Sequence, residues 1–227
     1  MSNNKASKDT QEVKSFFDGY ASDFDSIYGH TDHQRGVFDK LADKLFRQVM
    51  LLRFKETLKR TANSAINSVM DVGCGPGHYC VEFLKQGKKV MAIDLAENML
   101  QIAKQRVEAA NFDDKADISF LQANYLDHNF GEQYDAACLM GFFDYIQNPE
   151  DVLEKLKKDI TKEVYASFPQ SGGLLILQRK IRYNLRNCPL YLYSRKDVDN
   201  LMKKVGLEGK YEVIDLKRDF FVKIDMS

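Results

Sequence analysis

Two acidic residues and three glycines lie at a spacing that suits a ribose-containing cofactor. The segment Asp71-Val72-Gly73-Cys74-Gly75-Pro76-Gly77 stands between an apolar run and a helical pattern, and Asp94 closes the next apolar run. Gly73 can adopt the backbone angles of a tight turn, and Gly75 lets the main chain approach a ligand closely. The N–H groups where the helix begins favour a negatively charged group, and Pro76 suits the first turn of that helix. We therefore predict a cofactor whose ribose hydroxyls are bound by Asp94.

The exact glycine spacing separates two cofactor classes. A dinucleotide site of the G-x-G-x-x-G type would place its third glycine at position 78, which is His78, whereas this chain has Gly77. The resulting Asp-x-Gly-x-Gly-x-Gly pattern resembles motif I of the class I S-adenosylmethionine-dependent methyltransferases. The resemblance implies S-adenosylmethionine as cofactor, with its methionine end at the loop. A nicotinamide-dependent oxidoreductase and a non-catalytic cofactor-binding protein of the same fold stay open as alternatives.

The resemblance covers roughly residues 15–207 and is most specific between residues 68 and 145. Leu95 and Met99 match positions that flank the adenine in the family. Asn124 stands where many members have an Asp that faces the adenine amino group, and an Asn oxygen can still accept from that amine. The cofactor-binding residues implied are Tyr20, Asp71, Gly73, Cys74, Gly75, Gly77, Asp94, Leu95, Met99, Asn124, Tyr125 and Met140. Cys74 is expected to pack in the loop rather than to act as a nucleophile.

The end of the fourth apolar run bears on the acceptor. Family members that methylate planar nitrogens carry an Asn or Asp, two prolines and an aromatic residue there, whereas this chain has Met140-Gly141-Phe142-Phe143. This departure argues against methylation of a nucleic-acid base or an amide. We expect a small-molecule acceptor with oxygen as the methylated atom. An alcohol or phenol needs a base, and we assign that role to Asp144, with a capping or surface carboxylate as the alternative.

Within the family, the segment Phe16–Gly29 with its Ile-Tyr-Gly ending looks most like magnesium-protoporphyrin O-methyltransferases and related small-molecule enzymes. The resemblance implies that Tyr28 acts in catalysis or closes over the cofactor, with Tyr20 as a second lid residue and ordinary core packing as the alternative. A His is implicated in those enzymes at the position aligned with Asp144. The change from His to Asp alters the charge and reach of that group.

Two further patterns concern the substrate and metals. Arg179, Arg182 and Arg186 would share one face of a helix and could bind an anionic substrate, although a solvated basic face is the alternative. His30-x-x-His33 has a spacing compatible with metal ligation, but no convincing cluster of ligands accompanies it. We expect no metal site.

The elements that must position these residues follow from the periodicity of apolar residues. Helical steps connect Val37, Leu41, Leu45, Val49 and Leu52, which predicts an N-terminal helical cap over residues 1–60. Residues 61–227 are expected to form the cofactor-binding domain, an α/β fold with a doubly wound, mostly parallel seven-stranded sheet. The expected strands are 66–72, 89–93, 118–122, 134–140, 163–168, 211–216 and 220–224, and the expected helices are 78–86, 96–110, 149–158 and 195–205.

Composition limits the partners. The 227 residues include 33 Lys and Arg and 33 Asp and Glu, so no net field attracts nucleic acid or anionic lipid. The longest apolar stretch, residues 136–143, is far shorter than the roughly 20 residues of a membrane-spanning helix. The first fifteen residues lack the apolar core of a secretory signal, and the four cysteines form no C-x-x-C pair. We expect a cytoplasmic protein with free thiols, no nucleic acid partner and no membrane partner.

Overall fold

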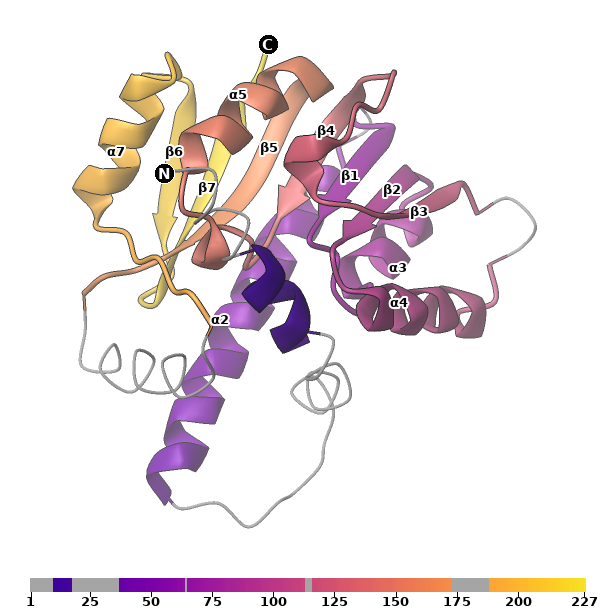
Figure 1. Ribbon diagram of the computed structural model, residues 1–227, viewed down its shortest axis with the longest axis horizontal. Helices are drawn as coiled ribbons and strands as arrows, with labels where there is room; N and C mark the ends of the chain where they lie inside the picture. The colour runs from indigo at the N-terminus through magenta and orange to yellow at the C-terminus, as the bar shows by residue number, and fades with distance from the viewer. Residues whose placement is uncertain (1–9, 18–36, 64, 113–115, 173–187) are drawn as a thin grey trace.

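The computed structural model describes residues 10–17, 37–63, 65–112, 116–172 and 188–227. Within these residues, seven strands form one sheet in the order β3-β2-β1-β4-β5-β7-β6 (Figure 1). The strands are β1 (Ser68–Val72), β2 (Lys89–Asp94), β3 (Ile118–Gln122), β4 (Tyr134–Leu139), β5 (Ile160–Pro169), β6 (Tyr211–Asp215) and β7 (Asp219–Asp225). Strand β7 pairs antiparallel with β5 and β6, and the other pairs are parallel. The predicted doubly wound, mostly parallel sheet is confirmed.

Helices cover both faces of the sheet. They are α2 (Val37–Thr61), α3 (His78–Lys85), α4 (Glu97–Ala109), α5 (Pro149–Asp159) and α7 (Arg195–Lys204). Apart from α2, which was predicted only as part of a helical cap, the bounds of these helices and of the strands lie within three residues of the predicted ones. Side chains of α5 and α7 belong to one buried core and side chains of α3 and α4 to another. In β1, Met70 and Val72 point to the first core and Val69 to the second, as the two-residue period of a strand requires.

The inner face of α2 agrees only in part with the predicted apolar stripe, since Val49 is buried as expected and Leu52 is not. Leu52 is 47% exposed, whereas Arg53, Thr57 and Thr61 are buried. These polar groups have partners: the Thr57 hydroxyl donates to the Arg53 carbonyl at 2.9 Å, and the Thr61 hydroxyl donates to the Thr57 carbonyl at 3.1 Å. Because both hydroxyls and Nη1 of Arg53 have hydrogen-bond partners, buried polar side chains can replace the expected apolar ones on this face.

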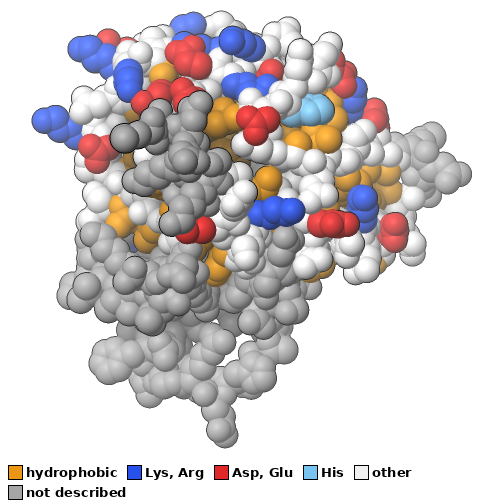
Figure 2. All heavy atoms as spheres, viewed as in Figure 1, with side chains coloured by type: hydrophobic (Ala, Val, Ile, Leu, Met, Phe, Trp, Pro, Cys, Tyr) orange, Lys and Arg blue, Asp and Glu red, His pale blue; other side chains and the backbone are white. Residues whose placement is uncertain are grey.

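Residues 10–17 form a separate short helix, drawn in indigo in Figure 1, beside α2. Lys and Arg side chains interleave with Asp and Glu side chains over the surface shown in Figure 2, in keeping with the balanced charge. Among the helices of the described residues, none combines the length and apolar character needed to cross a membrane.

Candidate functional site

The glycine loop joins β1 to α3 and is tied to β2. The backbone N–H groups of Gly73 and Cys74 both donate to the carbonyl of Ile93, at 2.8 and 2.9 Å. The guanidinium of Arg106 on α4 donates to the carbonyl of Pro76. These hydrogen bonds hold the loop at the carboxyl ends of β1 and β2, the edge at which open α/β sheets bind ligands.

The glycines of the loop serve different purposes. Gly75 has a φ of +52°, lines the pocket, and a Cβ built on it would meet no atom within 4 Å. Gly77 has a φ of +77°, and a Cβ there would lie 2.8 Å from the Cβ of Ala103 on α4. Gly77 therefore permits close packing of two helices, and it is not among the residues that line the pocket; its predicted role at the cofactor stays a prediction. Pro76 also differs: α3 begins at His78 with Gly77 as its N-cap, so Pro76 lies before the helix.

Asp94, at the end of β2, connects the second strand to the loop. Its Oδ2 accepts the N–H of Gly75 at 2.8 Å, and its Oδ1 accepts the N–H of Ala96 at 2.9 Å. A carboxylate offers about four acceptor positions, so one carboxylate can accept backbone N–H groups and hydroxyl groups of a ligand at the same time. The geometry thus suits a group with paired hydroxyls at this end of the pocket.

Asp71 lies beneath the loop, and its carboxyl is buried. The thiol of Cys80 donates to its Oδ2 at 3.3 Å. The pKa of Asp71 is raised to about 7, chiefly because the carboxyl is buried. The hydrogen bond from Cys80 lowers this pKa, and the nearby charge of Asp94 raises it. The pKa of Cys74 is raised well above its ordinary value, first by its hydrogen bond with Cys80 and then by burial. The thiolate is the nucleophilic form, so a raised pKa agrees with the packing role predicted for Cys74.

The pocket lining also contains the predicted adenine-flanking residues. Met99 is fully buried and Leu95 half-buried, and both line the pocket. Asn124 uses its side-chain oxygen to cap a short 3-10 helix, η1 (Tyr125–Asp127), by accepting the N–H of Leu126 at 3.3 Å. The hydroxyl of Tyr125 donates to Asp159 at 2.8 Å in the core, so Tyr125 presents only its ring and backbone to a ligand.

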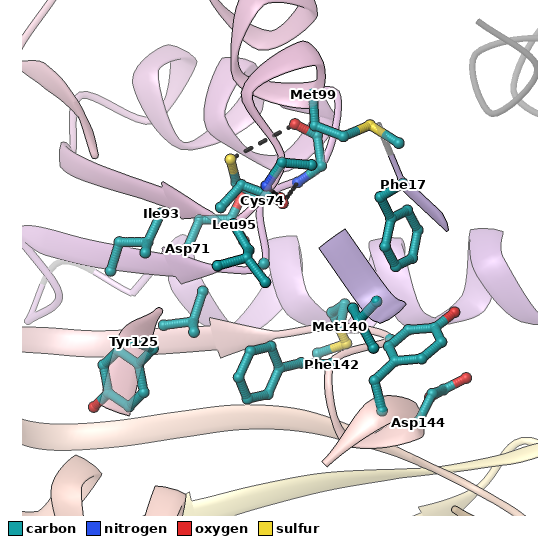
Figure 3. A pocket seen from close by; sticks show the side chains of 18 of the residues that line it. Phe17, Asp71, Cys74, Ile93, Leu95, Met99, Tyr125, Met140, Phe142 and Asp144 are labelled. Carbon is teal, nitrogen blue, oxygen red and sulfur yellow. Dashed lines mark hydrogen bonds between the residues drawn. The ribbon is translucent and has the colours of Figure 1, made fainter. Parts of the chain in front are cut away.

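A further part of the pocket lining is built by the residues that follow β4, where Phe142 lies against Gly73 of the loop. Met140 and Phe142 lie there, and Asp144 lies in a second 3-10 helix, η2 (Phe143–Tyr145) (Figure 3). Asp144 is 5% exposed, and its backbone carbonyl accepts the N–H of Tyr191 at 2.8 Å. Phe17, from the helix of residues 10–17, packs its ring edge-on against Tyr145 with centroids 5.3 Å apart.

One pocket joins these parts. It is lined by the predicted residues Asp71, Gly73, Cys74, Gly75, Asp94, Leu95, Met99, Asn124, Tyr125, Met140 and Asp144. The predicted residues Tyr20, Tyr28, Arg179, Arg182 and Arg186, and the pair His30 and His33, lie outside the described residues. Their roles stay predictions, as do the roles of the lining residues.

Sequence reasoning missed several pocket-lining residues that come from distant parts of the chain. Phe17, Arg53, Tyr145 and Asp219 are among them. Phe17 belongs to the segment Phe16–Gly29 discussed above, and Tyr145 directly follows Asp144, so their aromatic side chains beside predicted site residues were the available signal. Arg53 lies in a helical pattern and Asp219 at the start of the last strand, where neither position carries a local motif.

Comparisons with known proteins agree with this geometry. Residues 69–162 match a family described as a methyltransferase domain. A demethylmenaquinone methyltransferase from Porphyromonas gingivalis is 27% identical over 68% of this chain and 58% of its own length. A ubiquinone biosynthesis O-methyltransferase from Hydrogenovibrio crunogenus is 25% identical over 66% of this chain and 57% of its own length. The chain spans less than two thirds of either relative.

A solved structure extends the comparison to the N-terminal region. The magnesium protoporphyrin IX methyltransferase from Synechocystis PCC 6803, crystallised with S-adenosylhomocysteine, superposes with a TM-score of 0.71. The superposition covers 96% of this chain and all of that chain, at 18% sequence identity. At this identity the likeness concerns the fold.

Proposed function

Since the chain is a class I S-adenosylmethionine-dependent methyltransferase, we propose that it methylates an oxygen atom of a small-molecule acceptor. When bound, the cofactor supplies a methyl group on a positively charged sulfur. We assign its methionine end to the glycine loop, its ribose to Asp94, and its adenine to the wall formed by Leu95, Met99 and Asn124. The open space beside Gly75 and the position of the Asp94 carboxylate in the lining of the same pocket support this assignment.

The observation that carries the proposal is the position of Asp144. This carboxyl group is 5% exposed and lines the same pocket as Gly75 and Asp94. An alcohol or phenol must lose its proton as it accepts a methyl group, and a carboxylate beside the acceptor can take that proton. We propose Asp144 as this general base.

The walls near Asp144 determine how an acceptor is held. Phe17, Phe142 and Tyr145 give this end an aromatic lining, which suits a flat, largely apolar molecule. Methyl transfer from a sulfonium removes a positive charge, so a site that excludes water and aligns donor and acceptor favours the reaction. The names of the two quinone-related relatives support a small-molecule acceptor.

Two parts of the proposal concern the N-terminal cap and the charge of the acceptor. We propose that residues 1–60 cover the pocket and that Tyr28, assisted by Tyr20, closes over the cofactor; Phe17 already lines the pocket from this region. We also propose that an anionic group on the acceptor is bound by Arg179, Arg182 and Arg186. In the described lining, carboxylates outnumber cations, so binding of such a group depends on those arginines.

The test is product formation across an acceptor panel. Purified protein with S-adenosylmethionine is offered matched phenols, anilines and thiols, each with and without a carboxylate, and a structured RNA. We expect S-adenosylhomocysteine to accumulate and mass spectrometry to find a methyl ether on a phenol. Methylation confined to nitrogen, sulfur or RNA would overturn the proposal. A preference for the carboxylated phenol would support binding of an anionic group by the three arginines, and a preference for the neutral phenol would contradict it.

A further inference from the structure

A buried polar cluster lies at the acceptor end of the pocket. Arg53 of α2 places its Nη1 3.2 Å from a carboxylate oxygen of Asp219 on β7, and the same nitrogen donates to the hydroxyl of Ser167 on β5 at 3.0 Å. Arg53, Asp219 and Ser167 are 8%, 5% and 0% exposed. An ion pair this far from water is held in one geometry by its hydrogen bonds.

The cluster extends to the turn that follows β4. The hydroxyl oxygen of Ser167 also accepts the backbone N–H of Gly141 at 2.7 Å. Gly141 has a φ of +75° and stands between Met140 and Phe142, both pocket-lining residues. A Cβ on Gly141 would lie 3.9 Å from Nη1 of Arg53, so the guanidinium sits directly against this turn.

These contacts form a continuous connection between two parts of the chain that the sequence keeps far apart. It runs from Arg53 through Ser167 to the backbone of Gly141, and Arg53 and Gly141 both line the pocket. The N-terminal helix α2 is thereby linked to the wall on which the proposed reaction takes place. A displacement of Arg53 would remove a group that holds the Ser167 hydroxyl in place, and so loosen the hydrogen bond from that hydroxyl to the backbone of Gly141.

We propose that Arg53 is a positioning residue for methyl transfer. Acting through Ser167, it fixes the turn from Met140 to Phe142 against which the methyl donor and the acceptor are aligned, and Asp219 holds its guanidinium in place. The inference rests on the proposed function in one respect, the assignment of this turn to the acceptor end. Alignment errors of about 1 Å lower rates by about 100-fold in general, so loss of the contact affects turnover more than cofactor binding.

Arg60 provides a matched control on the same helix. It lies two turns further along α2, its Nη1 is 3.0 Å from a carboxylate oxygen of Glu212 on β6, and its guanidinium is over the ring of Phe221. It is not among the pocket-lining residues. Replacing Arg60 therefore removes an ion pair between α2 and the sheet and leaves the contacts of the turn at Gly141 unchanged.

The experiment is amide hydrogen exchange at Gly141, followed by NMR with S-adenosylhomocysteine bound. Four variants are compared with the wild type: Ser167→Ala, Arg53→Met, the double variant Arg53→Met with Asp219→Asn, and Arg60→Met. Ser167→Ala removes the acceptor and calibrates the readout. The double variant avoids leaving a buried carboxylate without its cation, which is the main risk to folding in the single variant.

We expect exchange at Gly141 to be about tenfold faster in Ser167→Ala and in both Arg53 variants, and unchanged within about twofold in Arg60→Met. Affinity for S-adenosylhomocysteine should stay within about threefold of the wild type throughout, and kcat with any accepted substrate should fall about tenfold or more in the Arg53 variants and not in Arg60→Met. Unchanged exchange in the folded double variant, or equal acceleration in Arg60→Met, would overturn the proposal. The exchange measurement needs no acceptor, so its result tests the role of Arg53 independently of the oxygen-methylation proposal.

Discussion

The carboxylate of Asp94 accepts the backbone N–H of Gly75 across 2.8 Å, so the end of β2 fixes the conformation of the loop that follows β1. Its other oxygen accepts the N–H of Ala96, where α4 begins. One side chain therefore orders both segments that we assign to the cofactor. The proposed ribose contact and the shape of the loop depend on the same group.

Replacing Asp94 with Ala is expected to weaken binding of S-adenosylhomocysteine by roughly 100-fold, or about 2.8 kcal/mol. The variant loses the proposed hydroxyl contacts and leaves two backbone N–H groups without their acceptor. Isothermal titration calorimetry measures the change. Glu97→Gln, which neutralises an exposed carboxylate three positions away, is the control and should bind as the wild type does. Equal affinity in Asp94→Ala would remove Asp94 from the cofactor site.

Two glycine substitutions should separate binding from folding. Gly75→Ala places a methyl group in open pocket space, so we expect weaker binding of S-adenosylhomocysteine with a loss of about 1 kcal/mol in the free energy of unfolding. Gly77→Ala drives its methyl into Ala103, so we expect a loss of about 3 kcal/mol from backbone strain and overpacking together. Urea unfolding and calorimetry on both variants check the contrast. The reverse order of stability losses would contradict it.

The fold and the glycine loop are predictable from the sequence because their signals are local. Strands buried on both faces read as short apolar runs, and the turn at Gly73 requires glycine. The spacing from Asp71 to Asp94 lies within one β-α-β unit, whose geometry is constrained by its short connections. Periodicity and spacing therefore suffice to place the loop and the end of β2 at one edge of the sheet.

The acceptor end was less predictable because its contacts join distant residues. Arg53 and Ser167 are separated by 114 positions, and Asp219 lies further still along the chain. In the helical pattern alone, Leu52 is the expected buried residue and Arg53 an exposed one, and the order is reversed by the partners that β5 and β7 bring to α2. Burial of a charge depends on a tertiary partner, and periodicity does not reveal that partner.

The raised pKa of Asp71 predicts a specific pH dependence of stability. Its pKa is about 7 in the folded chain against an ordinary value of 3.8, so the unfolded chain releases this proton first as pH rises. The folded state therefore loses stability from about pH 3.8 to pH 7, and the penalty is constant above that range. In Asp71→Asn the penalty is absent. The free energy of unfolding of the variant relative to the wild type should rise by about 2 kcal/mol from about pH 5 to about pH 7.

Urea unfolding at several pH values measures this change. The Asn side chain can also alter the hydrogen bond from Cys80, but an effect that is the same at every pH cancels when two pH values are compared. Asp117→Asn, at an exposed carboxylate just before β3, is the control. Its stability relative to the wild type should not follow the same curve. A flat difference for Asp71→Asn across this range would show that the buried carboxyl is ionised at low pH.

Asp144→Asn tests the proposed base. Asn keeps the size and much of the hydrogen bonding of the buried side chain but cannot take a proton from an acceptor hydroxyl. We expect kcat for a phenol to fall by about 100-fold or more, with the affinity for S-adenosylhomocysteine within about twofold of the wild type. Asp151→Asn, at an exposed carboxylate in the first turn of α5, should leave both values unchanged. Because a phenol of lower pKa ionises without help, the loss in Asp144→Asn should shrink along a series of increasingly acidic phenols. A uniform loss along that series would indicate that Asp144 shapes the pocket and does not accept the proton.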